Sequence, residues 1–250
     1  MAFWQTAGRL CLTGMVLVST GSQAAIALDR TRVIVDAGNQ SVSLSVANEN
    51  PRLPYLAQAW IEDERHNKVT TPLITLPPVQ RIEPGEKSQL KIQALPAINL
   101  LAQDKETLFY FNLREIPPRS DKPNTLQIAL QTRIKLFFRP AALKVSASGY
   151  QSPVQKQLTL IREGGRYRLN NPTGYYVTIV EASGRVDGPS VKGFEPIMVV
   201  PRASEPLSAS IAQLGDTPVL KYVNDFGGRS TLIFRCASSE CSVADVLNKG

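Results

Sequence analysis

The sequence predicts an all-β protein, with an immunoglobulin-like β-sandwich in its first half and a second β domain after it. Short runs in which apolar and polar residues alternate recur along the chain, which is the pattern of a strand with one buried face. Residues that favour turns close most of these runs. No helical stripe of comparable length interrupts them, and 43% apolar residues are enough for a buried core.

The first domain is assigned to residues 25–142. Its expected strands are residues 32–35, 42–46, 55–61, 88–92, 108–113 and 126–130. Six such strands in roughly 115 residues, separated by turns, come close to the roughly seven strands that are typical of an immunoglobulin-like sandwich. Trp60, inside the third of these runs, is expected to fill the core.

The alternation restarts in residues 143–250, which we assign to the second domain. The expected strands are residues 157–161, 167–169, 175–179, 197–200 and 231–234. Turn signals at Gly164-Gly165, Asn170-Asn171-Pro172 and Gly227-Gly228 separate them.

Residues 1–24 have the pattern of a secretory signal peptide. Arg9 precedes an apolar stretch from Leu10 to Val18, and small residues follow at Ser22 and Ala24. The apolar stretch is too short to span a bilayer, and no later run reaches the roughly 18 apolar residues that a spanning helix needs. We therefore expect an exported, soluble protein that is not inserted in a membrane.

Two of the three cysteines lie beyond the signal peptide. Cys236 and Cys241 form an even pair in an exported chain, which predicts a disulfide that clips a tight hairpin. A loop this short gains less from closure entropy than a long one, so a local staple is expected. The only histidine, His66, lies in a polar turn, where a solvated side chain is expected. No metal site is predicted.

The charge and the motifs exclude several functions. The formal net charge of +7 favours acidic partners, but no nucleic-acid-binding motif accompanies it. A search for catalytic triads, nucleophile elbows and phosphate-binding loops finds none, so neither an enzyme nor a cofactor is expected. Carboxylate pairs such as Asp104 and Glu106 are expected to be surface charges.

Residues 126–135 allow two interpretations. Alternation places Leu126, Ile128 and Leu130 on one face of a strand and Lys135 on the other face, unless a bulge intervenes. The three apolar side chains can be core residues of the sandwich, which is the commoner case. Alternatively they are exposed and form a docking strand, although an exposed apolar edge is otherwise prone to aggregation.

Four stretches, residues 28–32, 53–62, 108–118 and 134–140, closely resemble the PapD-like periplasmic chaperones of the chaperone–usher pilus pathway. The resemblance covers essentially the whole mature chain. It implies two immunoglobulin-like domains set in a boomerang, with a cleft between them. In this family Arg32 and Lys135 match a cleft pair that anchors the C-terminal carboxylate of a pilus subunit.

The resemblance also implies roles for other residues. Leu126, Ile128 and Leu130 match residues that fill the groove of an incomplete subunit by donor-strand complementation, while Gln127 and Gln131 face the chaperone's own side. Glu106, Arg139 and Asp225 match an interdomain set of salt bridges. Leu76-Pro77 matches a cis proline position, although relatives often carry threonine where Leu76 stands. The segment 117–124 resembles the short-loop subclass.

These observations predict a non-enzymatic periplasmic chaperone that binds pilus subunits one to one and delivers them to an outer-membrane usher. The sequence leaves open whether the free chaperone also self-associates through its exposed strand, as exposed edges invite pairing. The alternative is a secreted structural or adhesive sandwich, such as a pilus subunit. A subunit needs an alternating N-terminal extension, and residues 25–31 are too short to supply one.

Overall fold

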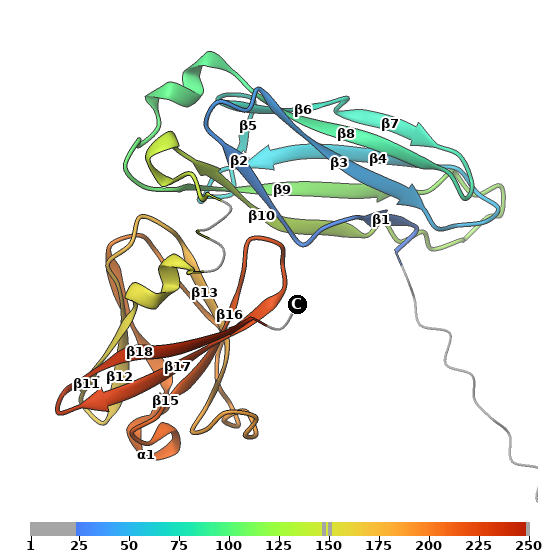
Figure 1. The fold of residues 1–250 in the computed structure, drawn as a ribbon. Coiled ribbons are helices and arrows are strands. Elements are labelled where there is room, and N and C mark those ends of the chain that lie inside the picture. Colours follow the sequence, from blue (N-terminus) through green and yellow to red (C-terminus); the bar gives the residue numbers. More distant parts are fainter. Residues whose placement is uncertain (1–23, 147–148, 150–151, 249–250) are drawn as a thin grey trace, which may run out of the picture.

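The computed structural model describes residues 24–146, 149 and 152–248. The predicted signal peptide, apart from Ala24, lies outside these residues. The described chain is almost entirely β, which confirms the predicted fold class. Figure 1 shows two β domains that meet at an angle, with the turn between β16 and β17 reaching the first domain.

Two sheets form the first domain. One has the strand order β1-β3-β8-β6, and the other has the order β2-β10-β9-β4-β5, with β7 also paired to β4. The strands are β1 (Ile26–Leu28), β2 (Arg32–Asp36), β3 (Ser41–Asn48), β4 (Tyr55–Glu62), β5 (Lys68–Val69), β6 (Leu73–Leu76), β7 (Val79–Ile82), β8 (Lys87–Ala94), β9 (Thr107–Ile116) and β10 (Gln131–Arg139). Short 3-10 turns follow β8 (η1, Pro96–Leu100) and β10 (η2, Ala141–Leu143).

The second domain is one hydrogen-bonded sheet of eight strands, in the order β14-β13-β16-β17-β18-β11-β12-β15. Its strands are β11 (Thr159–Glu163), β12 (Arg166–Asn171), β13 (Val177–Ser183), β14 (Ile197–Val199), β15 (Ala203–Ser210), β16 (Val219–Val223), β17 (Arg229–Ala237) and β18 (Glu240–Asn248). A 3-10 turn (η3, Val154–Gln157) precedes them, and one helical turn (α1, Ile211–Leu214) follows β15. Ser210 caps this turn in a capping box with Gln213.

Alternation along the strands builds a separate apolar core in each domain. On β4, Ala57, Ala59 and Ile61 are buried. Trp60 therefore points to the opposite face, and its expected place in the core is wrong. Its indole N–H donates to Glu62 Oε1 over 2.7 Å, and the Lys68 ammonium lies 4.6 Å from its ring centre. The tryptophan thus lies on the outer face of its sheet, among charged side chains.

The peptide bond between Leu76 and Pro77 is cis, as the family resemblance implied. A second cis bond joins Thr71 to Pro72 at the other end of β6. The bond between Thr71 and Pro72 lies in the turn from β5 to β6, and the bond between Leu76 and Pro77 lies in the turn from β6 to β7.

Candidate functional site

Arg32 and Lys135 lie side by side between the two domains. β2 and β10 pair in parallel, and their register places Lys135 opposite Arg32. The Arg32 Nη1 donates to the carbonyl of Val223 over 3.1 Å, and the Lys135 Nζ donates to Thr178 Oγ1 over 3.1 Å. Val223 and Thr178 belong to the second domain. Both cations therefore bond directly to the second domain.

The environment of this pair disfavours its positive charges. Burial lowers the pKa of Lys135 to about 8, and the neighbouring charge of Arg32 acts in the same direction. Burial also lowers the pKa of Arg32, although the carboxylates of Asp225 and Glu106 oppose this effect. The Arg32 Nε is buried and has no hydrogen-bond partner in the described part of the chain. A carboxylate bound here would reduce the repulsion between the two cations and accept hydrogen bonds from their side chains.

The strand β10 presents its side chains to two different surfaces. Its register with β9 is continuous from Gln131 to Phe138, so no bulge changes the alternation. Ile134 and Leu136 point into the core, while Lys135 points outward. An even number of positions separates Ile134 from Leu130, Ile128 and Leu126. In an extended chain these side chains therefore lie on the same face as Ile134, beyond the end of β10.

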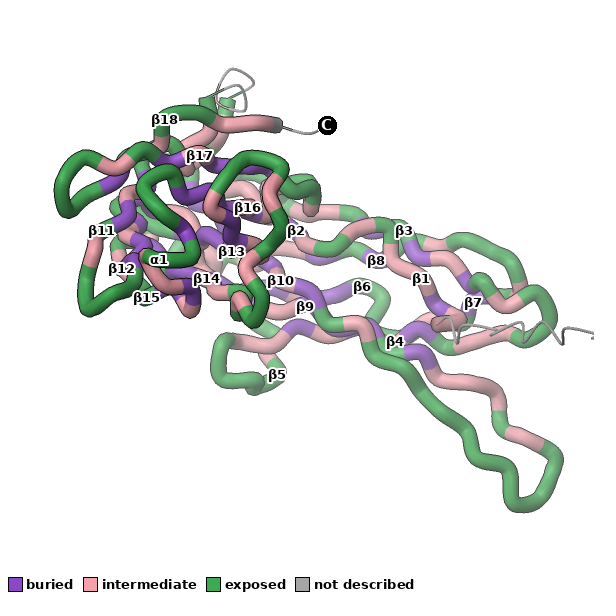
Figure 2. Tube along the Cα trace, turned by 90° about the horizontal axis from the view of Figure 1, so that it is seen from below, coloured by how far each residue is buried: buried purple, intermediate pink, exposed green. Residues whose placement is uncertain are grey.

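Leu126, Ile128 and Leu130 are exposed, with 85%, 65% and 37% of their surface accessible. The interpretation of these residues as core is therefore wrong. The predicted strand 126–130 is wrong as well, because these residues form no ladder with another strand. Only the Leu130 carbonyl is held by β9, through the backbone N–H of Glu115 at 3.0 Å. We call residues 126–130 the donor segment; in Figure 2 it belongs to the exposed, green part of the tube.

An unpaired strand edge connects the donor segment to the cation pair. β2 pairs only with residues 135–139 of β10, whereas β9 pairs along almost the whole strand. Within the described residues, no strand lies against the other edge of Gln131–Ile134. The open edge therefore runs from Leu126 to the point where Arg32 begins β2. Backbone groups along such an edge are free to pair with an added strand.

Glu106, Arg139 and Asp225 form a buried ionic cluster between the domains. The Arg139 Nε donates to Glu106 Oε1 over 2.9 Å, and its Nη1 and Nη2 donate to the Asp225 carboxylate over 2.6 and 2.9 Å. Arg139 is 2% exposed and Glu106 is 3% exposed, so the expectation of a surface charge at Glu106 is wrong. The other Glu106 oxygen accepts the backbone N–H of Tyr176 over 2.9 Å. The cluster thus ties β9 and β10 to two segments of the second domain.

Burial by itself would lower the pKa of Arg139, but the hydrogen bonds and charges of Asp225 and Glu106 outweigh it and raise that pKa. The two carboxylates therefore favour the charged form of the guanidinium.

Several residues of the cleft carry no signal in the sequence. Thr178 and Val223 contact the cation pair, and the rings of Phe137 and Tyr176 pack 5.5 Å apart beside it. Each lies in an ordinary alternating strand or next to one. Their role depends on how the second domain is placed against the first, which alternation within one strand does not encode.

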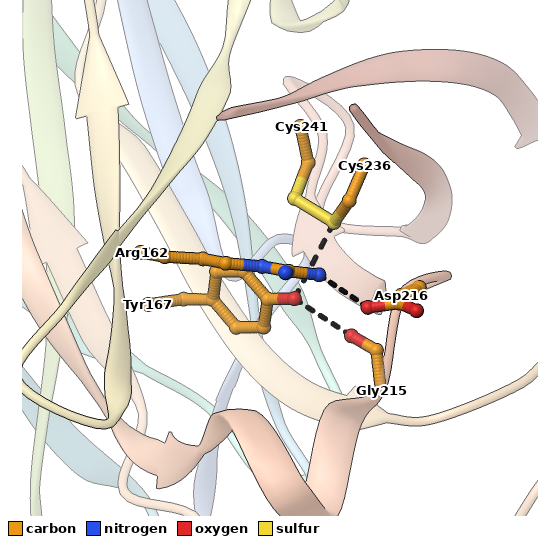
Figure 3. Close-up of a disulfide and its surroundings, with 6 residues drawn as sticks. All are labelled: Arg162, Tyr167, Gly215, Asp216, Cys236 and Cys241. Atoms are coloured by element: carbon orange, nitrogen blue, oxygen red, sulfur yellow. Dashed lines mark hydrogen bonds and ion pairs between the residues drawn. A yellow bond between two sulfur atoms is a disulfide. The ribbon is translucent and has the colours of Figure 1, made fainter. Parts of the chain in front are cut away.

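The predicted disulfide between Cys236 and Cys241 is present and joins the ends of β17 and β18 (Figure 3). The Tyr167 hydroxyl lies 3.3 Å from Cys236 Sγ and donates to the Gly215 carbonyl over 2.7 Å. Arg162 covers the tyrosine ring and pairs with Asp216. The bridge therefore fixes a hairpin at the end of the domain, away from the cleft.

Reduction of this bridge should destabilise the second domain modestly. The closed loop is short, so the chain-entropy model predicts a loss of about 2 kcal/mol in the free energy of unfolding. Urea unfolding with and without dithiothreitol measures this loss. A Cys236→Ser, Cys241→Ser protein should match the reduced wild type, and subunit binding should be retained because the bridge lies outside the cleft.

His66 is exposed in the turn between β4 and β5, as expected. Its ring stacks on Tyr110 with the ring centres 6.2 Å apart, and its Nδ1 lies 2.8 Å from Arg133 Nη2. Among the described residues no group of three or more histidine, cysteine or acidic side chains is placed to hold a metal ion. No helix in the described ranges is long and apolar enough to cross a membrane.

Two family models match the chain. The model for pili and flagellar-assembly chaperones, PapD N-terminal domain, matches residues 25–144. The model for the pili assembly chaperone PapD, C-terminal domain, matches residues 153–234.

Individual proteins agree with these models. The probable fimbrial chaperone YfcS of Escherichia coli K12 is 50% identical over 236 residues, covering 93% of this chain and 92% of that protein. The chaperone protein PapD of Escherichia coli is 49% identical over 229 residues, covering 91% and 93%.

Solved structures share the fold. The periplasmic chaperone SfaE matches with a TM-score of 0.66 and 28% identity, covering 83% of this chain and 98% of that one. A structure of the Salmonella enterica SafA pilin in complex with the SafB chaperone matches with a TM-score of 0.69 and 26% identity, covering 86% of this chain and 98% of the matched one. The chain therefore belongs to the PapD-like family of pilus-assembly chaperones.

Proposed function

We propose that this periplasmic chaperone binds one pilus subunit at a time and completes the subunit's fold with its own donor segment. The observation that carries the proposal is the open edge that leads from three exposed apolar side chains to a pair of half-buried cations. An added strand gains main-chain hydrogen bonds along that edge, and the apolar side chains give it a specific register.

Arg32 and Lys135 anchor the C-terminal carboxylate of the subunit. Arg32 and Lys135 lie opposite each other on neighbouring strands, so one carboxylate can accept hydrogen bonds from both side chains. Because the two cations are partly desolvated, each bond is stronger than it would be on the surface. The anchor recognises the end of a chain, because only the last residue carries a carboxylate on its backbone.

The position of the anchor sets the direction of the bound strand. Its C-terminus lies at Lys135, and its preceding residues lie beside the donor segment, so the two strands run parallel. From Leu126 to Lys135 a strand extends about 30 Å, at roughly 3.3 Å per residue. The last nine or so residues of the subunit, an estimate from the same rise per residue, therefore pair with the chaperone.

Donor-strand pairing also explains protection and release. While the apolar side chains fill the groove of the subunit, no other subunit can enter it, so polymerisation in the periplasm is blocked. At the outer-membrane usher, the N-terminal strand of another subunit replaces the donor segment, and this exchange needs no nucleotide and no enzymatic step. Without a subunit, a second chaperone copy can cap the same edge.

Periplasmic co-expression with the major pilin encoded nearest to this chain's gene tests the proposal. Wild-type protein carrying a tag should retain soluble pilin at one copy per chaperone. Lys135→Ala should retain at least tenfold less, because the carboxylate loses a charged, partly buried partner. Lys156→Ala, which removes an exposed lysine of the second domain, is the matched control and should retain the wild-type amount.

Retention of equal pilin by the wild type and Lys135→Ala would reject the carboxylate anchor. Failure of the wild type to retain any pilin, in a strain where the pilin is expressed, would reject the chaperone role for that partner.

Binding through the anchor should weaken above pH 8. In the free chaperone the pKa of Lys135 is lowered to about 8, whereas a bound carboxylate raises it. The charged lysine is therefore present below pH 7 in both states, and binding must take up a proton above pH 8. We expect the affinity for a peptide that carries the subunit's last strand to be constant below pH 7. Above pH 8 it should fall by up to tenfold per pH unit. Calorimetry measures this dependence.

Two controls identify the groups responsible. Lys135→Met should bind more weakly than wild type, with little change between pH 7 and pH 9. A peptide with an amidated C-terminus should behave in the same way with the wild-type chaperone. A steep pH dependence that persists in Lys135→Met would assign the titration to another group.

A further inference from the structure

A pocket of about 320 Å³ lies beside the base of the donor segment. Ala25 forms part of its wall, together with Tyr55 and the apolar side chain of Leu130. Its lining also includes Ala24, Asn50, Pro51 and Ile128. Two carboxylates, Glu49 and Glu115, face the same pocket, and none of the described residues that line it is basic. The pocket therefore has the chemistry of a site for a small cation beside apolar side chains.

Glu115 is built into the fold at this pocket. The residue is only 6% exposed, although it carries a carboxylate. Its Oε2 accepts the backbone N–H of Ile26 over 2.9 Å, and its own backbone N–H donates to the carbonyl of Leu130 over 3.0 Å. The other oxygen, Oε1, has no hydrogen-bond partner among residues 24–146, 149 and 152–248, and it is not one of the buried polar atoms left without a partner, so it is open to the pocket. A buried carboxylate with one oxygen unpaired favours a cationic partner.

The start of the mature chain supplies such a cation. The sequence predicts cleavage after Ala24, where hydrolysis of the peptide bond gives the carboxylate to Ala24 and the ammonium group to Ala25. The backbone N–H of Glu49 donates to the Ala25 carbonyl over 2.7 Å, which holds Ala25 at the pocket wall. The new ammonium group is thus tethered at the site, and its effective concentration exceeds that of any free cation.

We propose that the pocket binds the α-ammonium group of Ala25 as an internal ligand, between Glu49 and Glu115. Cleavage removes Ala24, which lines the same pocket, and creates three donors in place of one amide N–H. The ammonium group then neutralises the negative charge of Glu115. The side chain of Glu115 holds β1 through Ile26, and its backbone N–H holds the base of the donor segment through Leu130. The proposal requires that the chain begin at Ala25 and is independent of subunit binding.

The pKa of the α-amino group tests the proposal. The mature protein is purified from the periplasm, and its mass establishes that it begins at Ala25. The pH dependence of acetylation of the α-amino group, followed by mass spectrometry of the N-terminal peptide, gives its pKa. An unperturbed α-amino group has a pKa of about 7.7–8.0. We expect a value about one unit higher in the wild type, because two carboxylates favour the charged form.

Three variants separate the site from a general effect of charge. Glu115→Gln should return the pKa to about 7.7–8.0, the unperturbed range. A chain with one extra glycine before Ala25 should do the same, since it moves the ammonium group out of the pocket. Glu205→Gln, which removes an exposed carboxylate of the second domain, should leave the raised pKa unchanged.

If Glu115→Gln does not fold, Glu49→Gln provides a second test, because Glu49 is exposed and its loss leaves the core intact. It should lower the raised pKa by part of the shift. An unperturbed pKa in the wild type, or an equal decrease in Glu205→Gln, would overturn the proposal.

Discussion

Replacement of Leu126, Ile128 and Leu130 by serine in one protein should abolish subunit binding and leave the chaperone folded. Each side chain contributes about 1.5–3 kcal/mol when it is fully buried in an apolar groove. Loss of all three therefore costs more than about 4 kcal/mol, which corresponds to an affinity at least a thousandfold lower. In the free protein Leu126 and Ile128 are 85% and 65% exposed and Leu130 is 37% exposed, so the free energy of unfolding should change by no more than about 1 kcal/mol.

Co-purification of the pilin measures the first effect, and urea unfolding of the free chaperone measures the second. Ile161→Ser is the matched control, since Ile161 is 39% exposed on β11 of the second domain. It should bind pilin like the wild type. Unchanged binding by the triple variant would show that the subunit pairs with another part of the chaperone. A large loss of stability would show instead that the donor segment packs onto the chaperone itself.

Alternation in the sequence predicted the fold because most strands here have one face on a core. Residues 42–46, 88–92 and 108–113 were assigned to strands and lie within β3, β8 and β9. The expected strands do not include β1, β5, β6, β7, β10, β15, β16 and β18. The first four of these have at most four residues each, too few for alternation to show. Alternation therefore predicts a strand where the strand is long enough and each residue type reflects only whether its side chain is buried or exposed.

The expectation for Trp60 and the core interpretation of the donor segment, one of the two that the sequence left open, fail for the same physical reason. Alternation states which residues share a face but does not state which face is buried. For Trp60, size suggested the core, whereas Ala57, Ala59 and Ile61 occupy it. For Leu126, Ile128 and Leu130, apolarity suggested the core, whereas the chaperone has no strand there to form one.

The candidate site was recognised through the family resemblance, and its geometry required the structure. Nothing in the spacing of Arg32 and Lys135 indicates that the parallel pairing of β2 with β10 brings them together. Nor does the sequence show that Glu106 is buried beside Arg139, more than thirty residues away along the chain. Contacts of this kind depend on tertiary and interdomain packing, which local patterns do not encode.

Loss of Arg139 should cause a large decrease in stability. Removing one partner of a buried ion pair leaves the other charge desolvated, and such changes cost about 3–5 kcal/mol. In Arg139→Ala, Glu106 keeps only the backbone N–H of Tyr176, and Asp225 loses both of its guanidinium bonds. We therefore expect urea unfolding to show a loss of this size, together with weaker contact between the domains.

Two comparisons separate the buried charge from the interdomain link itself. Arg202 also pairs across the domains, with Asp104, but both side chains are more than half exposed. Arg202→Ala should therefore cost no more than about 1 kcal/mol. In the double variant Glu106→Gln, Arg139→Met, the unpaired charge at Glu106 is absent, so part of the lost stability should return. If the double variant were no more stable than Arg139→Ala, neither the packing of the side chain nor the unpaired charge of Glu106 would explain the loss, which would then come from the two bonds between Arg139 and Asp225.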